Sequence, residues 1–263
     1  MGSGRTEERS VDRSNDVVAG PSGPEHWYAE VRALRADTRA RRSARIDAAR
    51  RAGCTGVHFT SGGAGGATLT GAAHVELARQ AAELGLLYGV APIGPRQLAM
   101  SEPWADYWLL EARDRPTQEL TSRLGDSGRP VWLRVESADV PRALEVVDAL
   151  VVAGCRRIVV VCTSAPWSRD VGLGAIAQLR RESGLDVGWS EATGDQDLLR
   201  AAHRRYGARH LVVRVELEGE GRPGLGLDPS EVAALRAGLA EPRRPSAPVV
   251  ASDREDELAL AVG

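Results

Sequence analysis

The residues PRALEVVDALVVAGCRRIVVVC, from Pro141 to Cys162, contain a helix and a buried strand in direct succession. Apolar residues recur at helical spacing as far as Ala153, and Gly154 then ends the pattern, as glycine often does at the C-terminus of a helix. The run IVVV at 158–161 is apolar without alternation, which predicts a strand covered on both faces, as in a parallel sheet. A helix followed by such a strand is typical of an α/β fold.

The same alternation of strand and helix extends in both directions from this stretch. The predicted strands are 27–31, 56–60, 86–91, 107–111, 131–135, 157–162, 186–189 and 210–215, and the clearest helices are 38–52, 71–84, 141–153, 195–206 and 229–239. The segments after the third, fourth and sixth strands are shorter. Eight β-then-α units within about 215 residues predict a (β/α)8 TIM-type barrel, somewhat trimmed. A doubly wound open sheet is the alternative that the same alternation allows.

Polar segments flank the predicted barrel, which we place at residues 25–240. Residues 1–24 are rich in Arg, Ser, Asp, Gly and Pro, and we expect a disordered lead-in. Residues 241–263 begin with a Pro/Arg-rich linker and continue as a C-terminal tail.

The basic residues are all arginine: the chain has 34 Lys+Arg and no lysine. This excludes Schiff-base aldolases, lysine-anchored PLP enzymes and lysine P-loops, because each needs an amine. The formal net charge of −2 argues against binding to nucleic acid. A short basic run at Arg39, Arg41, Arg42 and Arg45 predicts a solvated helix face.

The cysteines and the hydropathy pattern indicate where the protein works. The three cysteines lack metal-binding or redox spacing, which suggests free thiols in a reducing cytoplasm. No segment approaches the roughly 18 apolar residues that a membrane span needs, and residues 1–24 lack an apolar signal core. We expect a cytoplasmic protein without membrane contact, and a homodimer on base rates alone.

The carboxyl ends of the strands are the place to search for a functional site, because active sites of such barrels lie there. Arginine and hydroxyl side chains gathered at this end could hold an anionic ligand, with a carboxylate as general acid or base. The alternative is that these groups pair with one another over the barrel mouth. Side chains that could take part lie at or just after the ends of the strands, among them Glu30, His58, Asp114, Arg134, Thr163, Ser164, Ser190 and Arg214.

Other patterns carry less chemistry. The glycine-rich run at 62–66 lacks the spacing and the lysine of nucleotide-binding loops, so we interpret it as a flexible loop. The five histidines show no ligand spacing, and only His58 could reach the site, which argues against a histidine-based zinc centre. Carboxylates could still hold Mg²⁺ or Mn²⁺, but nothing in the sequence specifies such a site, so we expect no metal and no cofactor. Cys162 ends a strand but lacks a histidine base, which favours packing over a nucleophilic role.

Six segments, in order along the chain, resemble segments of one enzyme family. They are YAEV (28–31), IDAARRAGCTGVHFT (46–60), GRPVWLRV (128–135), VVVCTSAP (159–166), GLGAIAQLRRESGLDVGWSEAT (172–193) and AAHRRYGARHLVVRVEL (201–217). In this order they resemble the N-acetylneuraminate (sialic acid) synthase family, barrel enzymes that condense phosphoenolpyruvate with an amino sugar. The resemblance places Glu30 at the position of a glutamate in the family's catalytic site and Asp114 at the acidic position after the fourth strand, so these two are the candidate catalytic residues. The candidate substrate-binding residues are His58, Arg134, Thr163, Ser164, Ser190 and Arg214.

The chain departs from this family where the family binds its metal. The two metal-binding histidines of the family correspond to Ala192 and Arg214, and alanine cannot bind a metal, while a guanidinium repels one. The family's site lysines correspond to His58 and Leu109. The chain also ends where the family's small C-terminal antifreeze-like domain would begin.

These observations leave three hypotheses about function. The first is a diverged, metal-independent enzyme acting on a small sugar-derived or enolpyruvate-like acid, with carbon–carbon bond formation as one such reaction. The second is a non-catalytic member of the family that binds a ligand or a partner enzyme. The third is an unrelated barrel, such as a sugar isomerase or epimerase, with Glu30 and Glu111 as acid and base. In the first hypothesis the ligand is a small anionic sugar-like molecule held by Arg134 and Arg214.

Overall fold

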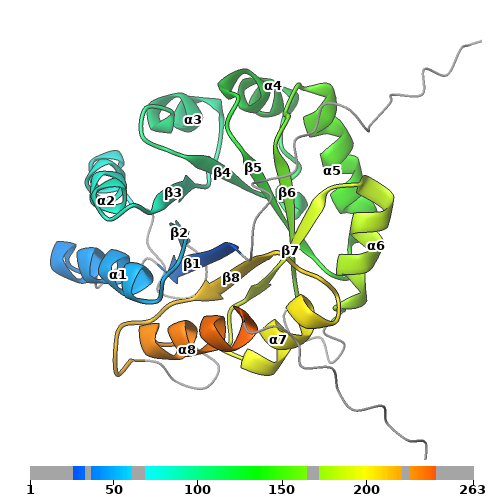
Figure 1. The fold of residues 1–263 in the computed structure, drawn as a ribbon. Coiled ribbons are helices and arrows are strands. Elements are labelled where there is room, and N and C mark those ends of the chain that lie inside the picture. Colours follow the sequence, from blue (N-terminus) through cyan, green and yellow to red (C-terminus); the bar gives the residue numbers. More distant parts are fainter. Residues whose placement is uncertain (1–25, 33–36, 61–68, 165–171, 221–225, 241–263) are drawn as a thin grey trace, which may run out of the picture.

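The computed structural model describes residues 26–32, 37–60, 69–164, 172–220 and 226–240 and shows a closed barrel of eight parallel strands (Figure 1). The strands are β1 His26–Arg32, β2 Gly56–Thr60, β3 Leu87–Val90, β4 Tyr107–Glu111, β5 Val131–Glu136, β6 Ile158–Thr163, β7 Asp186–Glu191 and β8 His210–Arg214. Each strand pairs with the next, and β1 pairs with β8 to close the barrel. The (β/α)8 barrel is confirmed, and the open-sheet alternative is wrong.

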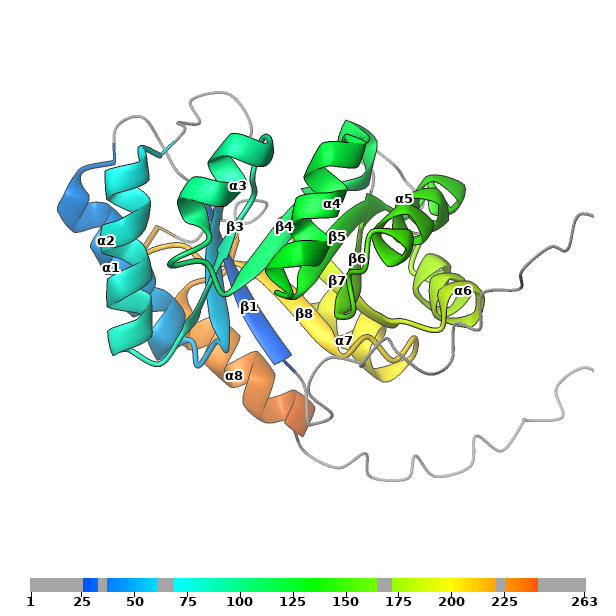
Figure 2. The ribbon, with the colours of Figure 1, turned by 90° about the horizontal axis from the view of Figure 1, so that it is seen from above.

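Helices surround the strands on the outside. They are α1 Arg39–Arg51, α2 Gly71–Glu83, α3 Pro95–Ser101, α4 Gln118–Ser127, α5 Val140–Val152, α6 Gly174–Ser183, α7 Gln196–Arg204 and α8 Pro229–Ala240, with a 3-10 turn η1 at Ala112–Asp114. Several neighbouring helices pack on each other, such as α1 on α2 and α5 on α6, and α8 packs on α1, so that the last helix meets the first (Figure 2). No helix among the described residues has the length and apolar character to cross a membrane.

Local sequence signals explain where the helices begin and end. The side-chain oxygens of Thr38 and Thr70 accept hydrogen bonds from the first-turn backbone of α1 and α2, as expected of N-cap residues. Gly53, Gly85 and Gly154 follow the ends of α1, α2 and α5 with positive φ angles, a conformation that glycine adopts without a Cβ clash.

Alternation along the strands separates two apolar layers. One cluster lies between the strands and the helices and includes Trp27, Ala29 and Val31 of β1. The other lies inside the barrel and consists of Tyr28, Tyr107, Trp132, Val159, Val161 and Val212, with Leu109 packed against it. Side chains two positions apart on a strand therefore share the barrel interior, and this places Glu30 above Tyr28 and Arg134 above Trp132.

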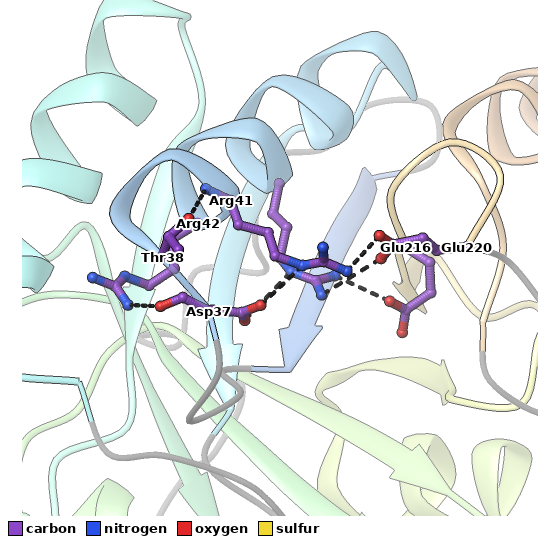
Figure 3. Close-up of polar contacts among 7 residues, drawn as sticks. Asp37, Thr38, Arg41, Arg42, Glu216 and Glu220 are labelled. Carbon is purple, nitrogen blue, oxygen red and sulfur yellow. Dashed lines mark hydrogen bonds and ion pairs between the residues drawn. The ribbon is translucent and has the colours of Figure 1, made fainter.

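A buried ion cluster joins the first helix to the segment after the last strand (Figure 3). Arg45 of α1 is 1% exposed, and its Nη1 donates to Glu216 Oε2 over 3.0 Å. Its Nε lies 3.6 Å from Asp37 Oδ2, and the neighbouring Arg41 pairs with Asp37 and with Glu220. The expected solvated face is therefore wrong for Arg45. Its partners come from sequence positions that the local pattern does not reveal.

Candidate functional site

The side chains expected at the mouth of the barrel lie in neighbouring positions at the carboxyl ends of the strands. In the strand register, Glu30 of β1 is opposite His58 of β2 on one side and Arg214 of β8 on the other. Thr163 of β6 is opposite Ser190 of β7. Glu30, Thr163 and Arg214 each follow a residue of the inner apolar cluster at a spacing of two, so the strand pleat turns them into the barrel.

Glu30 is the centre of an ion-pair network. Its Oε1 accepts from Arg214 Nη2 at 3.0 Å, and its Oε2 accepts from Arg134 Nη1 at 2.5 Å. Arg134 also donates through Nε to Glu111 Oε1 at 2.7 Å, so it bridges two carboxylates. Two guanidinium groups thus face two carboxylates, and the charges of the network balance.

The network keeps Glu30 ionised. Burial by itself raises the pKa of this carboxyl group, but the positive charges of Arg134 and Arg214 outweigh burial and lower the pKa to about 2. Burial lowers the pKa of Arg134, but Glu30 and Glu111 outweigh it and raise that pKa above the ordinary value. In the ligand-free protein at neutral pH, Glu30 carries no proton that it could donate.

His58 is fully enclosed beside this network. Its Nδ1 lies 3.1 Å from the hydroxyl of Tyr107, and its Nε2 has no hydrogen-bond partner among the described residues. Burial is the main cause that lowers the pKa of His58, to about 4; Glu30 opposes the shift and Arg134 adds to it. The imidazole is therefore neutral at pH 7, and the positive charge beside Glu30 comes from the two arginines.

A small cavity lies among these side chains. Its volume is about 10 Å³, which is room for about one water molecule. It is lined by His58, Leu109, Trp132, Arg134, Val161, Ser190 and Val212. The guanidinium side chains of Arg134 and Arg214 remain 24% and 19% exposed, so the network is reached from solvent.

The structure brings together Glu30, His58, Arg134 and Arg214, and it places Ser190 on the same cavity. Thr163 ends β6 beside Ser190, and Ser164 directly follows it.

Two groups of residues singled out in the sequence lie elsewhere. Asp114 lies on η1 with its side chain 71% exposed, and its ion pair is with the adjacent Arg113. The structure does not bring Asp114 to the network. The glycine-rich run at 62–66 lies outside the described residues.

Two further residues touch the predicted ones: Glu111, which the sequence suggested only as the partner of Glu30 in an isomerase or epimerase, and Tyr107, which it did not suggest. Glu111 binds Arg134, and Tyr107 binds His58. Both stand on the interior face of β4 with Leu109 between them, so the spacing of two was the signal that could have found them. Cys162 is fully buried in the outer apolar layer and burial raises its pKa to about 12, in agreement with the packing role.

The residues at the mouth do not fit the divalent cation of the family that the sequence resembles. At the two positions where that family has histidine ligands, this chain has Ala192 and the guanidinium of Arg214, which is bound to Glu30. Within the described ranges, no group of three or more His, Cys, Asp or Glu side chains is arranged to hold a metal.

Comparisons with known proteins support the fold. No protein-family model matches the chain, and no curated protein matches it in sequence. N-acetylneuraminic acid (sialic acid) synthetase from Leptospira borgpetersenii, solved with citrate, is similar in structure, with a TM-score of 0.69, 17% identity, and 88% of this chain and 93% of that chain covered.

Two further solved structures are similar in the same way. A truncated 3-deoxy-D-arabino-heptulosonate 7-phosphate synthase from Thermotoga maritima has a TM-score of 0.67 and 18% identity, with 83% of this chain and 86% of that chain covered. A spore coat polysaccharide biosynthesis protein from Bacillus subtilis has a TM-score of 0.68 and 15% identity, with 86% and 70% covered. At these identities the likeness establishes the barrel fold alone.

Proposed function

We propose that the protein is a metal-independent barrel enzyme that binds a small sugar-derived or enolpyruvate-like acid at the carboxyl end of its strands. The observation that carries the proposal is the convergence of Arg134 and Arg214 on Glu30, with both guanidinium side chains in contact with solvent. Guanidinium groups bind carboxylate and phosphate through strong, directional hydrogen bonds. The similar Leptospira structure was solved with citrate, a small carboxylic acid, which agrees with this ligand class.

In this mechanism the ligand competes with Glu30 for the arginines. A ligand carboxylate that takes over Arg214 Nη2 removes a positive partner from Glu30, while the burial of Glu30 persists. The pKa of Glu30 then rises, because burial favours the neutral carboxyl group. Glu30 becomes able to accept and return a proton only after the acid has bound, and we assign it the role of general acid and base.

Arg214 replaces the metal in this proposal. Its guanidinium is a fixed cation at the position where the family that the sequence resembles has a metal ligand. It can orient a carboxylate or polarise a carbonyl oxygen. Ser190 and Thr163 supply hydrogen bonds near the cavity. Asp114 has no role in these steps, because its side chain faces solvent.

A second candidate function is a non-catalytic binding protein. It is favoured by the balanced charges of the network and by the 10 Å³ cavity, which leaves little room for a ligand unless the ion pairs open. The two candidates make different predictions for a reaction assay.

The test is a mass-spectrometric assay of purified, metal-stripped protein with phosphoenolpyruvate and a panel of amino sugars, in parallel with and without Mn²⁺. We expect consumption of phosphoenolpyruvate and a new sugar acid without metal, and loss of both in Glu30→Gln. Calorimetry with phosphoenolpyruvate should show weaker binding for Arg214→Gln. Arg200→Gln should bind normally, because Arg200 pairs with Asp197 on the exposed face of α7.

Each other outcome has a defined meaning. Turnover that requires Mn²⁺ contradicts metal independence. Binding that depends on Arg214 without any product favours the non-catalytic protein. Absence of both binding and product for the whole panel rejects the proposed ligand class.

A further inference from the structure

A row of three residues crosses the inside of the barrel next to the ion-pair network. In the strand register, His58 of β2 is opposite Gly89 of β3, and Gly89 is opposite Tyr107 of β4. A Cβ atom at position 89 would lie 2.3 Å from ring atoms of Tyr107, so the aromatic ring occupies the space that any other side chain would fill. Because position 89 is glycine, Tyr107 reaches across a whole strand to His58.

The surroundings of Tyr107 and His58 decide which of the two donates the hydrogen bond between them. The Tyr107 hydroxyl makes its hydrogen bond to His58 Nδ1 and to no other group among the described residues. Its ring packs on Tyr28 and Trp132 within the inner apolar cluster, and Tyr107 is not among the residues that line the cavity. His58 does line the cavity, so its second nitrogen can donate to a water or a ligand there, whereas the hydroxyl has only Nδ1 as a partner among the described residues. A buried donor without an acceptor costs about 1–3 kcal/mol, so the hydroxyl donates its proton to Nδ1.

The second nitrogen of the ring then carries the proton. A neutral imidazole has one donor and one acceptor nitrogen, and Nδ1 is the acceptor here. Nε2–H therefore has no partner among the described residues, and His58 lines the cavity together with Arg134 and Ser190. The cavity is the place where an acceptor oxygen for this donor fits.

We propose that His58 binds the ligand directly, donating Nε2–H to an uncharged oxygen next to the ligand's acidic group, and that Tyr107 and Gly89 are positioning residues that fix this tautomer. The inference rests on the proposed function, since it assumes an acid held by the arginines. It adds a selection rule: the site accepts an acid with an acceptor oxygen on the carbon beside the carboxylate.

The chain contains a matched control for this arrangement. Tyr88 makes the same kind of contact with a second buried histidine, with its hydroxyl 2.9 Å from Nδ1 of His74, but this pair lies in the outer layer between α2 and β3. Tyr107→Phe and Tyr88→Phe therefore remove the same hydroxyl from the same kind of partner. Only His58, the partner of Tyr107, lines the cavity.

Nitrogen-15 NMR of the histidine rings in the ligand-free protein at pH 7 tests the tautomer. We expect wild-type His58, assigned by loss of its signals in His58→Gln, to be protonated at Nε2 alone. Tyr107→Phe should give a mixture of tautomers at His58, and Tyr88→Phe should leave the His58 signals unchanged. A wild-type His58 protonated at Nδ1 overturns the proposal, and this measurement does not depend on any ligand.

Binding of three small acids tests the contact. Pyruvate has only an acceptor at its second carbon, lactate has a hydroxyl group there, and propionate has no oxygen there. An Nε2–H donor predicts that pyruvate and lactate bind and shift the Nε2 signal, while propionate does not shift it. Tyr107→Phe should weaken pyruvate binding about five- to tenfold, as loss of one aligned hydrogen bond does, and Tyr88→Phe should not.

The outcomes distinguish a failure of the proposed function from a failure of the role assigned to His58. If all three acids bind equally and Arg214→Gln weakens them all, the proposed function stands and the role of His58 is wrong. If lactate alone is preferred, Nε2 is an acceptor and the tautomer is wrong. If none of the three acids and no phosphoenolpyruvate binds, the proposed function fails and the role of His58 fails with it.

Discussion

Glu30 is held between two guanidinium groups at the point where the first and last strands meet. Its burial and its ion pairs act on its pKa in opposite directions, and the ion pairs prevail. The ionised state of this carboxylate therefore depends on its neighbours and changes when one of them is removed.

Arg214→Gln tests this dependence at the level of one residue. The substitution removes one of the positive charges that stabilise the Glu30 carboxylate, so we expect the pKa of Glu30 to rise from about 2 toward the ordinary value for glutamate. Carbon-13 NMR of the glutamate carboxyl groups during a pH titration measures it. Arg200→Gln should leave the titration of Glu30 as it is in the wild type. An unchanged pKa in Arg214→Gln would show that Arg134 alone holds the charge.

At the scale of elements, Arg45 connects α1 to the segment that follows β8. Its guanidinium is almost inaccessible, and so is the side chain of Asp37. Removal of the arginine would leave Asp37 paired with Arg41 but would take the counter-charge from the buried Glu216, which is more costly than the loss of an exposed pair.

We expect Arg45→Met to lower the free energy of unfolding by about 3–5 kcal/mol. Arg200→Met, at an exposed pair on α7, should lower it by no more than about 1 kcal/mol. Urea denaturation followed by circular dichroism compares the two variants. Equal effects would mean that the buried cluster contributes no more than a surface ion pair.

A substitution at Gly89 tests the packing of β3, because this strand passes beneath the ring of Tyr107. We expect Gly89→Ala to destabilise the protein by about 1–3 kcal/mol, since the new methyl group overlaps the ring. Gly238→Ala is the control: this position lies within α8 with open space around its Cβ, and alanine should stabilise the helix by up to about 1 kcal/mol. A stable Gly89→Ala protein with an intact His58–Tyr107 contact would contradict the claim that Tyr107 reaches His58 only because position 89 has no side chain.

The elements were predicted well because their signals are local. The apolar run at 158–161 and the glycine stop at 154 suffice for β6 and the end of α5, and both are found within a residue or two. Glu30, Arg134 and Arg214 were predicted to lie together because each ends a strand, which sets their common edge. The partners of Arg45 could not be predicted, because Glu216 lies 171 positions away. Tyr107 was missed because its contact with His58 depends on Gly89, a residue without a side chain on the strand between them.

At the scale of the whole molecule, buried neutral histidines make the fold sensitive to acid. Burial is the main cause that lowers the pKa of His58, His74 and His210 from 6.5 to about 4. Below pH 6.5 these histidines are protonated in the unfolded chain but stay neutral in the folded protein. The free energy of unfolding therefore falls as the pH drops from 6.5 to 4. Each histidine contributes at most about 3 kcal/mol to this fall.

Urea unfolding midpoints from pH 8 to pH 3 measure this effect. We expect a plateau above pH 7, a fall between 6.5 and 4, and a further fall below 4.5, because Glu30 is then protonated in the unfolded chain while its pKa of about 2 keeps it ionised in the folded protein. His74→Gln should reduce the first fall and leave the second in place, because His74 is remote from the ion-pair network. A midpoint that stays constant down to pH 4 would contradict the neutral state of these histidines.

The closure of the barrel between β1 and β8 sets an order of events during synthesis. A ribosome makes β1 first, and the strand that completes its pairing, His210–Arg214, leaves last. Until then β1 has an open edge, Glu30 lacks Arg214, and Arg45 lacks Glu216. The nascent chain thus has an unpaired strand edge until the last strand is made, and such an edge favours aggregation. The barrel can close only after β8 has been synthesised.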